Sequence, residues 1–248
     1  MGIMRETIPN MHNFHIGEPG FERPTGRKHR LLQRLAKLMK LDVEIVPLPD
    51  PLSQMTTREQ RINLWHLAEQ VLAYGVPGDF VDLGCFNGLT SSLLAQILAQ
   101  RAPERRLHVY DSFEHRLGTM RDTRQALHEH FEARRLPEPV VHAGRFESTL
   151  PGELPAVIAF AQIDMGVGGL PEYHAALIES CLGHVWPRLA PGAVCVIQDY
   201  HHPENHVAPT DYYPFIKPTV DRFLTAHGAR ATAMLCGKYS HSFVRKSR

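Results

Sequence analysis

Residues 80–88 read FVDLGCFNG. The stretch begins as a mainly apolar strand pattern that includes Asp82, and it continues into a loop bounded by Gly84 and Gly88. Glycines let a backbone turn tightly and approach a ligand closely. A helix predicted over residues 90–101 follows, and its first amide groups and its dipole favour an anionic group. Asp82 favours an ammonium group at the same place. A ligand with an amino-acid moiety suits this loop, although an ordinary strand–turn–helix connection explains the same residues.

The spacing of these glycines differs from the GxGxxG pattern that seats the pyrophosphate of a dinucleotide. The next predicted strand, residues 107–111, ends in Asp111. An acid at that place accepts hydrogen bonds from ribose hydroxyls in nucleotide-binding folds, and a simple capping role is the alternative. The two strand ends together indicate a nucleoside that carries an amino acid, and S-adenosylmethionine fits that description.

Strand and helix patterns alternate through the rest of the chain, and the central strands are continuously apolar, as strands covered on both faces are. The sequence therefore predicts an α/β fold: a Rossmann-like, doubly wound, seven-stranded sheet, mostly parallel with an antiparallel last strand, and an N-terminal helical extension. The predicted strands are residues 79–84, 107–111, 139–142, 157–164, 193–199, 229–235 and 241–245, and the main helices between them are 90–101, 120–135, 171–189 and 214–226.

The first fifty residues differ from the rest in composition. Residues 1–54 form an arm with a basic helix over 27–40, followed by Pro47, Pro49 and Pro51, and residues 55–248 form the α/β domain. A helix with one basic face is typical of a membrane surface or an RNA contact. Because this single helix carries the whole basic excess, we favour a lid or a subunit contact, and we expect a homo-oligomer.

The composition excludes several classes of protein. The formal net charge is +1, so the protein as a whole has no strong positive potential that would attract nucleic acid or an acidic membrane. None of the four cysteines forms a CxxC pair, which favours a reducing compartment. We find no signal peptide and no apolar run of membrane-spanning length. We expect a cytoplasmic protein without a nucleic-acid or membrane partner.

Charged side chains also follow the fourth and fifth strands. The fourth ends at Asp164, and the fifth is followed by Asp199, His201 and His202. Because ligands of such sheets bind at the carboxyl ends of the strands, these residues are candidates for catalysis. Carboxylates with water suit magnesium, and a histidine suits a general base, while a solvated loop is the alternative for the histidines. We assign Asp164, Asp199 and His201 as catalytic candidates, and Asp164 and Asp199 as candidate metal ligands.

Several short stretches follow one another from about residue 55 onward, with gaps between them. They are GVPGDF (75–80), YDSFE (110–114), GRFESTLP (144–151), Ile163-Asp164, WPRLAPG (186–192) and Asp199-Tyr200. In the order and spacing of these stretches the chain resembles the macrocin O-methyltransferase (TylF-type) family of S-adenosylmethionine-dependent methyltransferases.

The resemblance implies a site for the cofactor and a reaction. It places Asp82, Gly84, Cys85, Phe86, Asn87 and Gly88 in the cofactor loop, Asp111 at the ribose, Ser112, Phe113, Arg145 and Phe146 near the adenosine, and Asp164 beside the cofactor. It also implies O-methylation of a hydroxyl, often on a sugar, and Mg²⁺ as a candidate second cofactor. The family's metal ligands come from the end of the fourth strand and from an Asp-Asp-Tyr run after the fifth.

This sequence departs from the family at the metal site. Gln198 stands at the first acid of the Asp-Asp-Tyr run, and Gly166 stands where a second acid often follows Asp164. Two fewer negative charges weaken a site for a hard cation. The main hypothesis is O-methylation of a small-molecule or natural-product hydroxyl. The alternatives are a metal-independent N- or phenol O-methyltransferase, and an inactive nucleoside-binding partner subunit.

Overall fold

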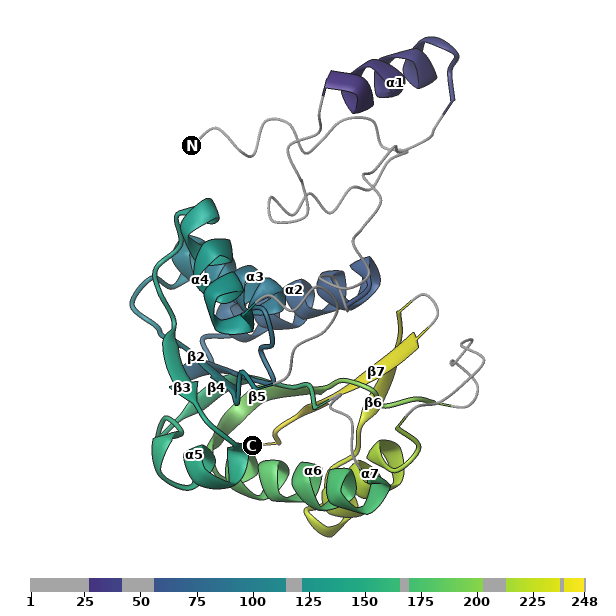
Figure 1. Cartoon of the computed structure of the whole chain (residues 1–248). Helices are drawn as coiled ribbons and strands as arrows, with labels where there is room; N and C mark the ends of the chain where they lie inside the picture. Colours follow the sequence, from purple (N-terminus) through teal and green to yellow (C-terminus); the bar gives the residue numbers. More distant parts are fainter. Residues whose placement is uncertain are drawn as a thin grey trace. The chain divides into compact units, whose positions relative to one another are not determined.

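The computed structural model describes residues 27–41, 56–114, 122–165, 170–202, 213–236 and 239–247 (Figure 1). The chain divides into two compact units, Met1–Met55 and Thr56–Arg248. The described part of the first unit contains helix α1 (Arg27–Leu38), as the basic pattern predicted. No described helix has both the length and the apolar character that crossing a bilayer requires.

The second unit is built on one seven-stranded sheet with the order β3-β2-β1-β4-β5-β7-β6. Strands β1 to β5 pair in parallel, while β7 runs antiparallel to both β5 and β6. The predicted Rossmann-like fold is therefore confirmed. The strands are β1 (Asp79–Leu83), β2 (Leu107–Asp111), β3 (Val140–Ala143), β4 (Ile158–Ile163), β5 (Leu189–Ile197), β6 (Thr232–Cys236) and β7 (Tyr239–Arg245).

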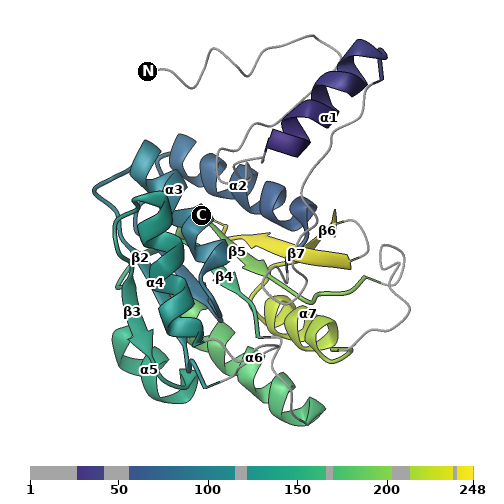
Figure 2. The ribbon, with the colours of Figure 1, turned by 45° about the horizontal axis from the view of Figure 1, so that its top comes forward.

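Helices cover both faces of the sheet, which explains why every residue of β4 is buried (Figures 1 and 2). One face carries α2 (Arg58–Ala73), α3 (Leu89–Arg101) and α4 (Thr123–Arg134), and the other carries α5 (Phe146–Glu153), α6 (Pro171–Val185) and α7 (Ile216–Ala226). The order of the strands reverses between β1 and β4, so a ligand site is expected at the carboxyl ends of these two strands.

The local sequence explains where the helices begin and end. Thr57 caps α2 with its side chain, and Gln60 completes a capping box. The predicted helix 171–189 ends earlier, at Val185, and continues as a 3₁₀ turn, η1 (Trp186–Arg188), because Pro187 has no N–H to extend the helical ladder. The fifth strand begins earlier than predicted and ends at Ile197, so residues 198 and 199 follow the strand.

The segment after β3 differs from the sequence-based expectation. No helix was predicted between residues 142 and 157, but β3 runs to Ala143 and helix α5 starts at Phe146. Pro151 lies inside this helix, and a proline is normally a sign that a helix has ended. The helix is short, and side chains of neighbouring strands hold its C-terminal end.

Candidate functional site

The loop after β1 follows a path that only glycine permits at its first position. Gly84 has φ +85°, and a Cβ atom there would lie 1.6 Å from the carbonyl oxygen of Asp164. Its N–H donates to the carbonyl of Tyr110 at 2.8 Å. The ends of β1, β2 and β4 therefore meet at this residue, and any side chain would push β1 and β4 apart.

The carboxylate of Asp111 joins two loops at the end of β2. It accepts hydrogen bonds from the N–H of Phe86 at 2.8 Å and from the N–H of Phe113 at 2.8 Å. Both of these residues have positive φ values, 48° and 55°. A carboxylate has about four lone-pair sites, so Asp111 keeps acceptor capacity for ribose hydroxyls.

Asp82 is buried beneath the loop. One of its oxygens accepts a 2.6 Å hydrogen bond from the hydroxyl of Ser91, and Oδ1 has no partner among the described residues. Burial raises the pKa of Asp82 to about 7, Ser91 opposes this shift, and the nearby carboxylates of Asp164 and Asp111 reinforce it. Three carboxylates close to one another favour a cationic ligand, because a positive charge relieves their repulsion.

A cavity of about 480 Å³ opens at the ends of β1, β2 and β4. Six of the predicted cofactor residues line it: Gly84, Asp111, Ser112, Arg145, Phe146 and Asp164. Sequence reasoning missed the other lining residues, which are Glu114, Gly144, Glu147, Met165, Leu170, Tyr173 and Leu177. Four acids and one base line the cavity, which gives it a negative field suited to a cation.

The other predicted cofactor residues build the loop and do not line this cavity. Asp82 lies beneath the loop, and the N–H groups of Phe86 and Phe113 donate to the carboxylate of Asp111. Asn87 Oδ1 accepts from the N–H of Leu89 at 3.2 Å, and Gly88 has φ +76° at the start of α3. Cys85 is buried, and burial raises the pKa of its thiol. These residues therefore set the path of the loop without lining the cavity.

A second group of side chains lies around Tyr213. Burial, together with the carboxylates of Asp199 and Asp164, raises the pKa of Tyr213. The charges of the two carboxylate candidates, Asp164 and Asp199, therefore both act on this phenol. His174 of α6 stacks on that ring at 5.6 Å, and its ring nitrogens have no hydrogen-bond partner among the described residues. His174 is itself buried.

His201, the candidate base, is 7% exposed, and its backbone N–H donates to the carbonyl of Asp199 at 3.1 Å. Asp199 has φ +53°, an uncommon value for a residue other than glycine. The turn after β5 is therefore held in a strained conformation next to Asp164. Gly166 lies outside the described residues.

Gln198 adds no negative charge to the magnesium site that the family resemblance implies, and its side chain has other partners. Gln198 Oε1 accepts a hydrogen bond from Gln60 Nε2 at 2.9 Å and lies 3.2 Å from His241 Nδ1. The amide is neutral, and its oxygen is already bonded on the side of α2 and β7. The described residues contain no group of three His, Cys, Asp or Glu side chains that could hold a metal ion.

Comparison with known proteins agrees with this geometry. The family model described as Macrocin-O-methyltransferase (TylF) matches residues 44–144. Over these residues the chain resembles the macrocin O-methyltransferase (TylF) family. The TylF-type match covers the Gly84 loop, Asp111 and β3.

A curated relative and two solved structures extend the comparison. The 8-demethyl-8-(2,3-dimethoxy-α-L-rhamnosyl)-tetracenomycin-C 4′-O-methyltransferase of Streptomyces olivaceus is 32% identical over 160 residues, 56% of this chain and 59% of that protein. The match thus spans about three fifths of the relative's length.

The O-methyltransferase NovP superposes with a TM-score of 0.60 at 20% identity, over 77% of this chain and 80% of NovP. The O-methyltransferase TomG from Streptomyces achromogenes, solved in complex with S-adenosylmethionine, gives 0.53 at 17% identity, over 90% and 91%. At these identities the two structures confirm the fold.

Proposed function

We propose that the chain is an S-adenosylmethionine-dependent methyltransferase. The main support for this function is the acidic cavity at the ends of β1, β2 and β4. Asp111 and Asp164 line this cavity, and Asp82 lies beneath it. The cofactor has a sulfonium, an ammonium and a ribose diol, and these groups match the carboxylates in charge and in hydrogen bonding. Phe146 offers an apolar surface to the adenine.

We propose a small-molecule hydroxyl, on a sugar or a similar group, as the methyl acceptor. The TylF match supports O-methylation, and the curated relative is named for a 4′-O-methyl transfer to a rhamnosyl group. The test is to incubate the protein with S-adenosylmethionine and a panel of rhamnosylated aromatic polyketides, and to detect a methylated product by mass spectrometry. Methylation at nitrogen only, or of a phenol only, would contradict this proposal.

The proposed mechanism assigns two tasks to the residues of the chain. The cofactor, when bound, supplies a methyl group activated by its sulfonium. The first task is alignment of the acceptor oxygen with that methyl group, which provides roughly 7–11 kcal/mol in favourable cases. The second is removal of the hydroxyl proton, for which Asp164, Asp199 and His201 are the candidates, and a positioned base adds about a hundred- to ten-thousandfold.

Magnesium binding at Asp164 and Asp199 stays a prediction, and the arrangement of Gln198 favours proton removal without it. Its amide oxygen is bonded to Gln60, and no charge remains at the position of the family's first acid. We therefore expect turnover to survive an excess of a strong chelator within about twofold. Loss of turnover in chelator, with recovery on adding Mg²⁺, would contradict this expectation.

We also propose that residues 1–54 act as a lid or a subunit contact and that the protein forms a homo-oligomer. Helix α1 leaves Leu31, Leu35 and Leu38 exposed along one face, which supports this proposal. Replacing Leu35 with Asp in the full chain tests it by light scattering and by acceptor KM. A change in oligomeric mass indicates a contact between subunits, and a raised acceptor KM at unchanged mass indicates a lid. An effect on neither would overturn both roles.

A further inference from the structure

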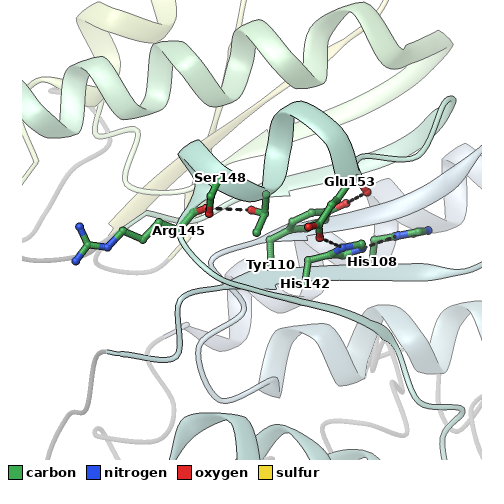
Figure 3. A network of polar contacts seen from close by, with 7 residues as sticks. His108, Tyr110, His142, Arg145, Ser148 and Glu153 are labelled. Atoms are coloured by element: carbon green, nitrogen blue, oxygen red, sulfur yellow. Dashed lines mark hydrogen bonds and ion pairs between the residues drawn. The ribbon is translucent and has the colours of Figure 1, made fainter.

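Four titratable side chains form a row behind α5. Asp79 starts β1, His108 and His142 lie in β2 and β3, and Glu153 ends α5. His142 Nδ1 lies 2.6 Å from Glu153 Oε2, and His142 Nε2 lies 3.1 Å from His108 Nδ1 (Figure 3). His108 Nε2 faces Asp79 Oδ2 at 3.5 Å. The row is therefore acid–histidine–histidine–acid.

The register of the sheet produces this row. Tyr110 is the partner of His142 in the parallel pairing of β2 and β3, and His108 lies two residues before Tyr110. Alternate residues of a strand share a face, so the three rings lie together under α5. The ring of His142 stacks on Tyr110 at 4.2 Å and lies 5.3 Å from the ring of His108. The rings are therefore held in place by packing.

Counting hydrogens shows that the neutral pair is one proton short. The row has three junctions: Glu153 to His142, His142 to His108, and His108 to Asp79. Each junction needs one hydrogen between its two heavy atoms, because carboxylates and bare imidazole nitrogens only accept. Two neutral imidazoles carry two N–H hydrogens, so one junction always brings two acceptors together.

The count holds for either tautomer. If His142 donates to Glu153 and His108 donates to His142, the unfilled junction is at His108 Nε2, which has no hydrogen-bond partner in the described part of the chain; if His108 donates to Asp79 instead, the unfilled junction is the one between the two histidines. If His142 donates to His108 instead, the unfilled junction is at Glu153. One added proton fills all three junctions, and a second would place two N–H groups against each other in the middle. The pair therefore holds at most one extra proton.

The surrounding charges set the direction of this titration. Burial lowers the pKa of His108, Asp79 opposes that shift, and His142 and Arg106 add to it. The pKa of His108 therefore lies on the acid side of the ordinary imidazole value of about 6.5. Glu153 lies against His142. Burial and Glu153 raise the pKa of Tyr110, and Arg188 opposes this, so the phenol stays neutral.

Helix α5 connects this row to the cavity. Its first residues, Phe146 and Glu147, line the cavity together with Arg145, and its last residue is Glu153. The helix has eight residues, contains Pro151 and lacks a side-chain N-cap, so it has little stability of its own. The bonds of Glu153 to His142 and of Tyr110 OH to the Glu153 carbonyl, 2.8 Å, hold its C-terminal end.

We propose that His108 and His142 hold one proton as a pair and that this proton strengthens the attachment of α5 to the sheet, so that cofactor affinity depends on it. The proposal rests on the proposed function, because the ligand is S-adenosylmethionine. His108, His142, Asp79 and Glu153 are then positioning residues that act through the α5 wall of the cavity.

The first experiment counts protons without a ligand. Side-chain ¹⁵N NMR of the full chain, titrated from pH 8 to pH 4.5, follows the four ring nitrogens. We expect the two histidines to take up one proton together. Uptake of two protons, or of none, in that range would overturn the inference whatever the protein binds.

The second experiment uses isosteric amides that supply the missing hydrogen. In Glu153→Gln the amide N–H fills the first junction, and in Asp79→Asn it fills the third while its oxygen still accepts from the N–H of Arg106. At each pH, both variants are expected to bind S-adenosylhomocysteine as tightly as wild type would with its histidine pair protonated. The ratio of wild-type to variant Kd should rise about three- to tenfold from pH 5 to pH 8.

Glu138→Gln is the matched control, because Glu138 makes an exposed 2.9 Å contact to a single histidine, His128. Its Kd ratio to wild type should stay constant with pH. A constant ratio for both amide variants would overturn the link to α5. Absence of any S-adenosylhomocysteine binding in wild type would instead contradict the proposed function, while the proton count still tests the pair.

Discussion

Oε1 of Gln198 lies 3.2 Å from Nδ1 of His241, so two buried side chains link the end of β5 to β7. An amide oxygen only accepts, so Nδ1 of His241 carries the hydrogen. Nε2 then accepts from Asn63 Nδ2 at 3.1 Å. The neutral imidazole thus has a partner at both nitrogens, and protonation at Nε2 would place two donors together.

His241 makes the folded protein sensitive to acid. Burial lowers the pKa of His241 to about 4, below the unfolded value of about 6.5. Its contribution to stability is therefore present above pH 6.5 and is lost as the pH falls toward 4. Urea unfolding of wild type should lose about 2–3 kcal/mol more between pH 7.5 and pH 4.5 than unfolding of His241→Gln. Equal losses would contradict this, and the exposed His128→Gln serves as the control.

Asp82 links cofactor binding to proton release. Its pKa is about 7 in the folded protein, so near neutrality part of the population is protonated. The ammonium group of the bound ligand lowers that pKa, so S-adenosylhomocysteine should bind more tightly as the pH rises through 7 and should release a proton. Calorimetry in two buffers of different ionisation enthalpy measures that proton. Asp82→Asn should bind about tenfold more weakly with no proton release, and release that persists in this variant would assign it elsewhere.

Asp164 lines the cofactor cavity, and its charge also acts on Tyr213. We expect Asp164→Asn to lower kcat by about a hundredfold or more, because the amide cannot accept the hydroxyl proton. Binding of S-adenosylhomocysteine should change by only a few fold. Near-normal kcat in this variant would remove Asp164 from the reaction, and Asp199→Asn tests the second carboxylate in the same way.

The substitution Gly84→Ala tests how closely β1 and β4 approach each other. A Cβ atom there meets the Asp164 carbonyl at 1.6 Å, so Gly84→Ala should cost several kcal/mol of folding free energy or abolish folding. The control is Gly183→Ala in α6, where nothing lies within 4 Å of the added Cβ. That change should stabilise the protein by about 0.5–1 kcal/mol. Thermal unfolding measures both, and similar small effects would mean that the loop can relax.

The features that depend on local sequence were predictable. The glycine turn after β1, the acid that ends β2 and the alternation of strands and helices all follow from residues that are close together in the chain. The sequence therefore predicted the sheet, the antiparallel last strand and six of the residues that line the cavity.

The features that depend on distant residues were not predictable. Gln198 was identified as a departure from the family, but its partner Gln60 lies 138 residues away, so the sequence did not reveal the amide pair. The row from Asp79 to Glu153 joins three strands and a helix, and only the register places its members together. Helix α5 was missed because Gly144 and Pro151 are typical of a loop.

The most direct test of the central claim is the thermal midpoint of the full chain with and without S-adenosylhomocysteine. At a hundred times its Kd, the ligand adds about 2.7 kcal/mol to the stability of the folded state, which corresponds to a rise of roughly 5–10 °C for a protein of this size. We predict that rise, and we predict that a strong chelator leaves it unchanged. No rise at millimolar ligand would contradict the assignment of the cavity to S-adenosylmethionine.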